Sequence, residues 1–331
     1  MRIINITNGD RIPTVWTDDF IDSLRGLGEL QLEDNGVALS DDEVAEQVRT
    51  HDVAIVGWDA RPLPALLAED PGELLYVCCY SGTIRGLIPR SLLEAGVAVS
   101  NWGDHPANGV AEAAMALLLA VLKDLPRAVG VARSQKWGVH TSRRGSLAGT
   151  RVGVYGCGII GRRFVELLRP FRSQIRIFDP YAESLPEGCE RAGSLDELVD
   201  GCEVLVIHAG LSDETTASLR AEHFAQLPDD AVVINTARGA ILDQEALFAE
   251  LQSGRLRAGL DVLEPDYLPP DHPMLALDNC LLGFHQLDQL QWPPRPGLTP
   301  MQQICVDNVA RFVSGETPEW LFDSDRYDRS T

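Results

Sequence analysis

Residues 151–179 decide the fold and read RVGVYGCGIIGRRFVELLRPFRSQIRIFD. The short apolar run Arg151–Tyr155 predicts a buried strand, and the glycines after it, Gly156, Gly158 and Gly161, have the spacing GxGxxG. In such a turn the first glycine permits a sharp bend, the second lets a pyrophosphate approach the backbone, and the third lets the next helix pack closely on the strand. The stretch therefore predicts a strand, a phosphate-binding turn, a helix and a second strand.

A carboxylate ends this unit, because Asp179 follows the apolar run Ile175–Phe178. An acid at the end of the second strand can accept hydrogen bonds from both ribose hydroxyls of NAD, and it repels the extra phosphate of NADP. A GxGxxG motif alone is a weak signal, since glycine turns without a ligand are common, but here strand, helix and acid agree. We predict that NAD lies against Gly156, Gly158, Ile159, Ile160, Gly161 and Asp179; a purely structural turn is the alternative.

The composition is that of a globular protein with room for two domains. The chain has 331 residues, of which 45% are hydrophobic and 23% are charged. Its 28 basic and 49 acidic residues give a net charge of −21, which repels nucleic acid and anionic membranes. We therefore expect no nucleic-acid or membrane partner.

The cellular location is predicted from what the chain lacks. The start, MRIINITNGDR, has no apolar segment typical of a secretory signal, and the most apolar stretch, Val110–Leu125, is too short to span a bilayer. Seven cysteines without a CxxC pair favour a reducing compartment, and adjacent Cys78 and Cys79 are expected to be core residues on opposite faces of a strand. The sequence thus predicts a cytoplasmic protein without a metal site.

Strands and helices alternate along the whole chain, which is typical of parallel sheets. In the first hundred residues the predicted strands are Arg2–Ile6, Glu29–Leu32, Val53–Val56, Leu74–Cys79 and Val97–Ser100, and the predicted helices are Asp18–Leu27, Asp41–Arg49, Pro62–Glu69 and Pro89–Ala95. Ser40 and Glu43 are placed to form a capping box. A long, largely apolar helix is predicted over Asn108–Arg133. Beyond Asp179 the predicted helices are 194–199, 220–226, 244–253 and 300–314, and the predicted strands are 204–208, 232–236, 258–262 and 280–283.

Three stretches after predicted strands carry residues suited to chemistry. Arg238 in VINTARGAILD can hold a carboxylate with two hydrogen bonds, although a surface ion pair is the alternative. AGLDVLEPD carries Asp261, Glu264 and Asp266, an acidic run that taken alone is typical of a solvated loop. His285 in LLGFHQL could be a general acid and base, or a structural residue. Together they supply what hydride transfer needs beside a nicotinamide: a proton carrier and a substrate anchor.

With these motifs the chain resembles the D-isomer-specific 2-hydroxyacid dehydrogenase family over most of its length. The matching pieces, in order, are SGTIRGLIPRSLLEAGVAVSN, NGVAEAAMALLLAVL, GVYGCGIIGRR with FDP, IHAGLSDETTASL, INTARGAILDQEAL and GLDVLEPD. The resemblance implies an α/β fold of two doubly wound parallel-sheet domains. It places a Rossmann NAD-binding domain at 105–286, inserted into a flavodoxin-like substrate domain at 1–104 and 287–331.

The resemblance also implies the site residues. A catalytic trio of arginine, acid and histidine falls on Arg238, Asp266 and His285. The substrate carboxylate would be bound by Arg238 and by backbone N–H groups around Ser81, Gly82 and Thr83. The further contacts implied for NAD are Val110, Thr236, Ala237, Arg238 and Asp261 at the nicotinamide end, and Asp179, His208 and Thr215 at the adenosine end.

The chain departs from the family at the acid. The family usually has glutamate where Asp266 stands, and aspartate is one methylene shorter. The contact to His285 is therefore either longer than usual or made by Glu264, and the offset of Asp266 from the DV pair favours Asp266. Phe284 also replaces the usual proline before the histidine.

Other departures bear on the substrate. Arg85 stands where the family often has an acid, so it either binds a second anionic group or is simply exposed. The connection 286–298 is longer than usual, and its Trp292 and Arg295 either close over the substrate or serve packing and solubility. The substrate is thus a 2-oxo acid, with or without a second negative charge.

These observations lead to one hypothesis and two alternatives. The hypothesis is a homodimeric NAD-dependent dehydrogenase that interconverts a 2-oxo acid and its (R)-2-hydroxy acid, with Asp266 orienting His285. One alternative is a non-catalytic NAD-sensing protein such as a corepressor, since the family includes corepressors that retain the trio. The other is formate dehydrogenase, which Asp266 disfavours because that enzyme uses a neutral glutamine there.

Overall fold

The computed structural model describes residues 1–82, 84–134, 145–287, 296–328 and 330. Its contacts divide the chain into two compact units. The first unit is Met1–His105 with Gln291–Thr331, and the second is Pro106–Leu290. The roles predicted for them, substrate binding in one and NAD binding in the other, stay predictions at this point.

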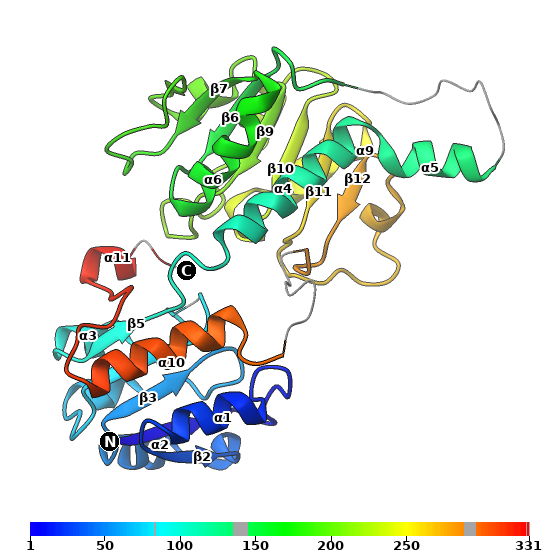
Figure 1. Ribbon diagram of the computed structural model, residues 1–331. Coiled ribbons are helices and arrows are strands. Elements are labelled where there is room, and N and C mark those ends of the chain that lie inside the picture. The colour runs from blue at the N-terminus through cyan, green and yellow to red at the C-terminus, as the bar shows by residue number, and fades with distance from the viewer. Residues whose placement is uncertain (83, 135–144, 288–295, 329, 331) are drawn as a thin grey trace. The chain divides into compact units, whose positions relative to one another are not determined.

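The first unit is built on a five-stranded sheet in the order β2-β1-β3-β4-β5, with every neighbouring pair parallel (Figure 1). Its strands are β1 (Arg2–Ile6), β2 (Glu29–Glu33), β3 (Val53–Val56), β4 (Tyr76–Cys79) and β5 (Ala98–Ser100). β3 and β4 are buried along their whole length, as expected of parallel strands that helices cover on both faces.

A different set of helices covers each face of this sheet. One face carries α1 (Asp18–Arg25) and α10 (Pro300–Val313); the other carries α2 (Asp41–Arg49), the 3₁₀ turn η2 (Ala65–Ala68), α3 (Arg90–Glu94) and α11 (Ser324–Asp328). Cys78 packs in the core of the first face and Cys79 in that of the second, which confirms that they point in opposite directions. The capping box of α2 is also confirmed, because the Ser40 N–H donates to the Glu43 carboxylate at 2.8 Å and the Glu43 N–H to the Ser40 hydroxyl at 3.3 Å.

The second unit is a seven-stranded parallel sheet in the order β12-β11-β10-β9-β6-β7-β8 (Figure 1). Its strands are β6 (Arg151–Tyr155), β7 (Gln174–Phe178), β8 (Glu190–Arg191), β9 (Val204–Ile207), β10 (Val232–Asn235), β11 (Arg257–Leu260) and β12 (Cys280–Leu282). From β6 the chain first builds outward through β7 and β8, and then returns to β9 on the other side of β6. Open parallel sheets bind ligands at such a switch point, outside the carboxyl ends of the strands.

Both faces of the second sheet are covered. α4 (Ala107–Leu122) and α6 (Ile159–Leu168) pack on one face, where Leu118 and Phe164 share a core with Val154. The other face carries α7 (Leu195–Val199), α8 (Ala221–Gln226) and α9 (Gln244–Gln252). The predicted fold class, α/β with doubly wound parallel sheets, is confirmed in both units.

Two predicted helices were wrong. The single helix over Asn108–Arg133 is instead α4 followed by α5 (Leu125–Arg133), and Asp124 between them has a left-handed φ of 49°. Pro126 explains the break, because proline cannot donate the N–H that a continuous helix needs there. The helix over Pro62–Glu69 is only the 3₁₀ turn η2, which follows Pro64.

Some short elements had no sequence prediction. They are β8, α11 and the 3₁₀ turns η1 (Gly36–Ala38), η3 (Arg169–Phe171), η4 (Gly239–Ile241) and η5 (Pro273–Ala276). Among the described residues, every helix is too short or too polar to cross a lipid bilayer.

Candidate active site

The glycine turn after β6 has the geometry expected of a phosphate-binding turn. Gly156 has a φ of +96°, and a Cβ there would lie 2.4 Å from the backbone nitrogen of Ala209. A Cβ on Gly161 would lie 2.2 Å from the carbonyl oxygen of Gly156, so the helix packs directly on the turn. Gly158 begins α6, and a Cβ there would meet nothing within 4 Å. Backbone N–H groups at this helix start are thus open to an anion.

Asp179 ties the end of β7 to this turn. Its Oδ2 accepts a hydrogen bond from the Cys157 N–H at 2.6 Å, and its Oδ1 accepts from the N–H groups of Tyr181 at 2.8 Å and Ala182 at 3.1 Å. The sequence reasoning assigned Asp179 only to the ribose. The structure adds a positioning role, and Oδ2, which among the described residues accepts only the hydrogen bond from Cys157, retains acceptor capacity for a ligand hydroxyl.

Two buried polar side chains at the same edge have no hydrogen-bond partner within the described residues. They are Thr236, through its hydroxyl, and His208, through both ring nitrogens. Burial lowers the pKa of His208 to about 3, so the ring is neutral at pH 7. Unpaired buried polar groups are costly and usually have a ligand or water as partner. Together with the open helix start, they make this edge fit a dinucleotide.

The other residues predicted to contact the cofactor differ in exposure and in hydrogen bonding. The Thr215 hydroxyl is already used within its own loop, where it donates to the Gly210 carbonyl at 2.7 Å and accepts from the Ser212 N–H at 2.7 Å. Ile159 is 45% exposed at the start of α6, whereas Val110 is buried in α4. Their contacts to a cofactor stay predictions.

Arg238 lies on a loop whose backbone is fixed from two sides. The Asn235 side chain donates to the Arg238 carbonyl at 2.9 Å and accepts from the Ala237 N–H at 3.0 Å. A Cβ on Gly239 would lie 2.1 Å from the backbone of Leu263, so this loop packs directly on the chain that leads to Asp266. Asn235 was missed as a positioning residue, although it stands in the quoted stretch INTARGAILDQEAL.

His285 is held by Asp261 and lies beside Asp266. It has a left-handed φ of +57°, and its N–H donates to the Asp261 carbonyl. The buried Asp261 carboxylate accepts from the N–H groups of Gln286 at 3.2 Å and Leu287 at 3.4 Å. The imidazole Nδ1 lies 3.4 Å from the Asp266 carboxylate, and the two side chains are 43% and 47% exposed. The ring is therefore oriented by an acid and accessible to a substrate.

Glu264, the alternative partner of His285, has its backbone engaged elsewhere. Its N–H donates to the side-chain oxygen of Gln244 at 2.9 Å, and its carbonyl accepts from the same amide at 3.1 Å. Gln244 thereby fastens the acidic loop to the start of α9. Gln244 stands in the quoted stretch INTARGAILDQEAL, but the sequence reasoning gave it no role. The imidazole of His285 contacts the carboxylate of Asp266, which favours Asp266 as the orienting acid.

Strand order brings the three candidate catalytic residues to one edge. β10, β11 and β12 are parallel neighbours, and Arg238, Asp266 and His285 lie on the loops that follow them. Adjacent loops are linked, the first two through Gly239 and the last two through the contact between Asp266 and His285. The candidate site is therefore continuous along the carboxyl edge that also carries the glycine turn.

Apart from Arg238, the residues predicted to bind the substrate carboxylate belong to the first unit. Ser81 is buried, and its hydroxyl lies 3.2 Å from the sulfur of Cys79. A Cβ on Gly82 would lie 2.7 Å from the indole nitrogen of Trp102. The rings of Trp58 and Trp102 meet edge to face with centroids 5.3 Å apart. Gly82 thus adjoins this pair of aromatic rings.

The other residues considered for substrate binding are Thr83, Arg85, Trp292 and Arg295. Thr83, Trp292 and Arg295 lie outside the described residues. Arg85 is exposed and donates to the backbone carbonyls of Tyr327, at 3.4 Å, and Asp328. This favours a structural role for Arg85 over binding of a second anionic group.

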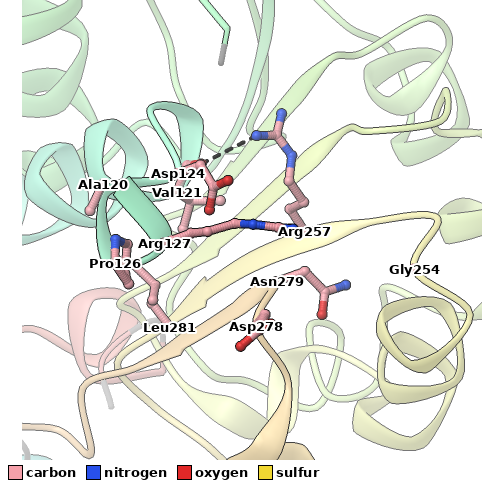
Figure 2. Close-up of a pocket in the computed structure, with 10 residues that line it drawn as sticks. All are labelled: Ala120, Val121, Asp124, Pro126, Arg127, Gly254, Arg257, Asp278, Asn279 and Leu281. Atoms are coloured by element: carbon pink, nitrogen blue, oxygen red, sulfur yellow. Dashed lines mark hydrogen bonds between the residues drawn. The ribbon is translucent and has the colours of Figure 1, made fainter. Parts of the chain in front are cut away.

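A cavity of about 200 Å³ lies at the opposite edge of the second sheet (Figure 2). Arg257 begins β11 and Asn279 precedes β12, so this cavity adjoins the amino ends of the strands. Arg257 donates to the carbonyl of Val121 at 3.2 Å, and Asn279 to those of Leu251 and Leu256 at 2.8 Å. These polar groups are used within the fold, and the cavity is separate from the candidate site.

Replacing Gly161 by alanine is expected to weaken NADH binding by at least about tenfold. The new methyl group would collide with the Gly156 carbonyl, which moves the helix start away from the turn that should hold the pyrophosphate. Fluorescence titration with NADH measures the effect. Gly130→Ala, inside the helix α5 where a Cβ would meet nothing within 4 Å, is the control for adding a methyl group to a helix. Unchanged affinity in Gly161→Ala would show that phosphate does not bind at this turn.

Comparison with known proteins finds a family profile and relatives that are similar to this chain. The sequence profile of the D-isomer specific 2-hydroxyacid dehydrogenase NAD-binding domain matches residues 115–286. The D-3-phosphoglycerate dehydrogenase of Methanocaldococcus jannaschii is 29% identical over 309 residues, which are 91% of this chain and 57% of that protein. The chain thus spans little more than half of that relative.

Two further comparisons cover the chain more evenly. The hydroxypyruvate reductase of Thermotoga maritima is 30% identical over 265 residues, which are 78% of this chain and 85% of that protein. The solved structure of an acyclic imino acid reductase in complex with NADPH and D-arginine has a TM-score of 0.79 at 22% identity and covers 98% of this chain and 100% of that one. At that identity the likeness shows the fold alone.

Proposed function

The chain belongs to the D-isomer specific 2-hydroxyacid dehydrogenase family, and from this we propose that it is an NAD-dependent oxidoreductase that interconverts a 2-oxo acid and its (R)-2-hydroxy acid. The observation that carries the proposal is the imidazole of His285. It lies 3.4 Å from the Asp266 carboxylate, at the sheet edge that also carries Arg238 and the glycine turn. An oriented, accessible imidazole at this edge is suited to proton transfer beside a dinucleotide.

Each residue of the trio has a separate task in this proposal. When bound in its reduced form, the dinucleotide supplies the hydride that the carbon at position 2 receives. His285 holds a proton on Nε2 and gives it to the 2-oxygen, while Asp266 keeps the ring in place through Nδ1. Arg238 binds the substrate carboxylate and polarises the 2-oxygen with its planar array of N–H donors.

NAD rather than NADP is the proposed cofactor. Asp179 presents a carboxylate beside the glycine turn, where it can accept hydrogen bonds from ribose hydroxyls and repel a phosphate on the 2′ position. The chain's own residues thus favour NAD, whatever the preference of relatives.

The proposed assembly is a homodimer in the cytoplasm. α5 has no buried residue among those described, and it exposes Leu125 and Val129, 52% and 39% respectively. Apolar side chains on an otherwise uncovered helix are suited to contact with a second copy. Seven cysteines fit a reducing compartment.

The substrate is best identified by a panel of 2-oxo acids. Relatives named as hydroxypyruvate reductases, glyoxylate reductases and D-3-phosphoglycerate dehydrogenases make glyoxylate, hydroxypyruvate, oxaloacetate and a phosphorylated 2-oxo acid the first choices. The measurement is loss of NADH absorbance with each acid. We expect turnover with at least one of them and a marked preference for NADH over NADPH. Tight NADH binding without turnover on any acid would instead favour a non-catalytic NAD-sensing protein.

A further inference from the structure

A hydrogen bond joins two loops that flank the adenosine end of the candidate cofactor site. The Tyr181 hydroxyl donates to the carboxylate of Glu214. Tyr181 lies just beyond β7, next to the backbone segment that Asp179 holds, and it is 53% exposed. Glu214 lies on the loop after β9 and is also exposed. Neither residue took part in the sequence-based assignment of the site.

The order of the strands shows which parts of the sheet edge this hydrogen bond connects. β7 and β9 are the two neighbours of β6, so the loops after them lie on opposite sides of the glycine turn that follows β6. Tyr181 and Glu214 thus connect the two sides of the end of β6. In an open parallel sheet this is the region where the adenine and its ribose lie.

The last residue of β6 is influenced by the carboxylates of both loops. The phenol of Tyr155, the last residue of the strand, lies 3.1 Å from the Ser218 hydroxyl. Burial raises the pKa of Tyr155, and the nearby charges of Asp179 and Glu214 raise it further. Both acids are therefore close to the same strand end, one from each neighbouring loop.

Glu214 is held in this position by its surroundings. The loop that carries it is closed by the hydrogen bonds of the Thr215 hydroxyl to Gly210 and Ser212. The bond from Tyr181 then restrains the carboxylate itself. A fixed charge discriminates between ligands better than a mobile one, because it cannot turn away from an unfavourable neighbour.

We propose that Glu214, positioned by Tyr181, is a second determinant of the preference for NAD over NADP, acting together with Asp179. This inference rests on the proposed function. The 2′-phosphate of NADP would enter between two carboxylates that approach from opposite sides of β6, whereas the uncharged ribose of NAD would not be repelled. The Tyr181 and Glu214 side chains also form one wall of the adenosine site.

Two arginines of this edge hold the loop after β7. Arg162 donates to the carbonyl of Ser184 at 2.5 Å, and Arg191 donates to the carbonyls of Asp179 at 3.2 Å and Ala182 at 2.7 Å. Their guanidinium groups are thus already used to hold the loop after β7. Both cations stay in place in the variants tested below, so a substituted acid is the only charge that changes.

The test is equilibrium binding of NADH and NADPH to the full chain, followed by fluorescence without substrate. We expect Glu214→Gln to lower the Kd for NADPH by about threefold to tenfold and to leave the Kd for NADH within about twofold. The gain should shrink as salt is raised, because added ions screen the repulsion that the substitution removes. Tyr181→Phe should shift the ratio of the two Kd values in the same direction by less.

A matched control separates this role from a general effect of charge. Glu222→Gln removes the same charge from an exposed position on α8 and should leave the Kd ratio unchanged. An unchanged ratio in Glu214→Gln, or an equal loss of affinity for both dinucleotides, would overturn the inference while the proposed function stands. Failure of the unsubstituted chain to bind either dinucleotide would instead overturn the proposed function.

Discussion

Replacing His285 by asparagine is expected to lower kcat by about 100-fold to 10,000-fold, with NADH affinity unchanged. The imidazole is the group that we propose donates the proton to the 2-oxygen, and asparagine cannot do so. Asparagine is the suitable replacement because His285 has a φ of +57°, a conformation that asparagine adopts more readily than most residues. The backbone hydrogen bonds to Asp261 should therefore persist. Steady-state kinetics with the best 2-oxo acid measures the loss, and fluorescence titration measures NADH binding.

The chain offers a matched control for this substitution. His272 begins the 3₁₀ turn η5 and accepts the N–H of Met274 at 3.2 Å, a role that asparagine can take over. His272→Asn should therefore retain full turnover. If His285→Asn retains turnover as well, the proton comes from another group and the assignment of His285 is wrong.

Replacing Arg238 by alanine is expected to lower kcat/KM by about 100-fold to 1,000-fold, the range found when one preorganised donor to a developing oxyanion is removed. Arg238→Lys should recover only part of this loss, because lysine restores the charge without the planar pair of donors that a carboxylate needs. NADH affinity should change little in either variant. Kinetics at varied 2-oxo acid concentration, with NADH held saturating, measures both variants.

Arg163→Ala serves as the control, since Arg163 is exposed on α6 and pairs with Glu166 at the surface, at 3.0 Å. It should retain normal kcat/KM. Equal losses of NADH affinity and of kcat/KM in Arg238→Ala would show that Arg238 supports the fold of its loop rather than the substrate.

Much of the fold could be predicted because local patterns and tertiary structure agree. Most strands of both sheets are short apolar runs, and the glycine turn leaves α6 only one place to begin. The break at Asp124 was also signalled, because Pro126 stands where a continuous helix needs an N–H donor, but the apolar run of α4 concealed it. Short elements such as β8 had no such pattern, since pairing with a neighbouring strand defines them.

The sequence predicted the candidate catalytic residues but not the residues that hold them in position. Arg238, Asp266 and His285 each follow a strand, and the resemblance to a family assigned them together. Of the residues that hold them, Gln244 bonds to the backbone of Glu264, which lies close to it only after folding. Asn235 bonds to the backbone two and three residues further along its own loop, where no glycine or proline precedes Arg238. The left-handed backbone at His285 likewise depends on hydrogen bonds to Asp261, which no local pattern reveals.

The central claim is that hydride passes directly between a bound nicotinamide and carbon 2 of a 2-oxo acid at the edge formed by Arg238 and His285. Transfer of label from NADH deuterated on the reactive face tests it most directly, with the hydroxy acid product analysed by mass spectrometry. The account predicts one deuterium at carbon 2 of the (R) product, and almost none in the same time from His285→Asn. A chain that binds NADH tightly yet transfers no deuterium to any 2-oxo acid would contradict it.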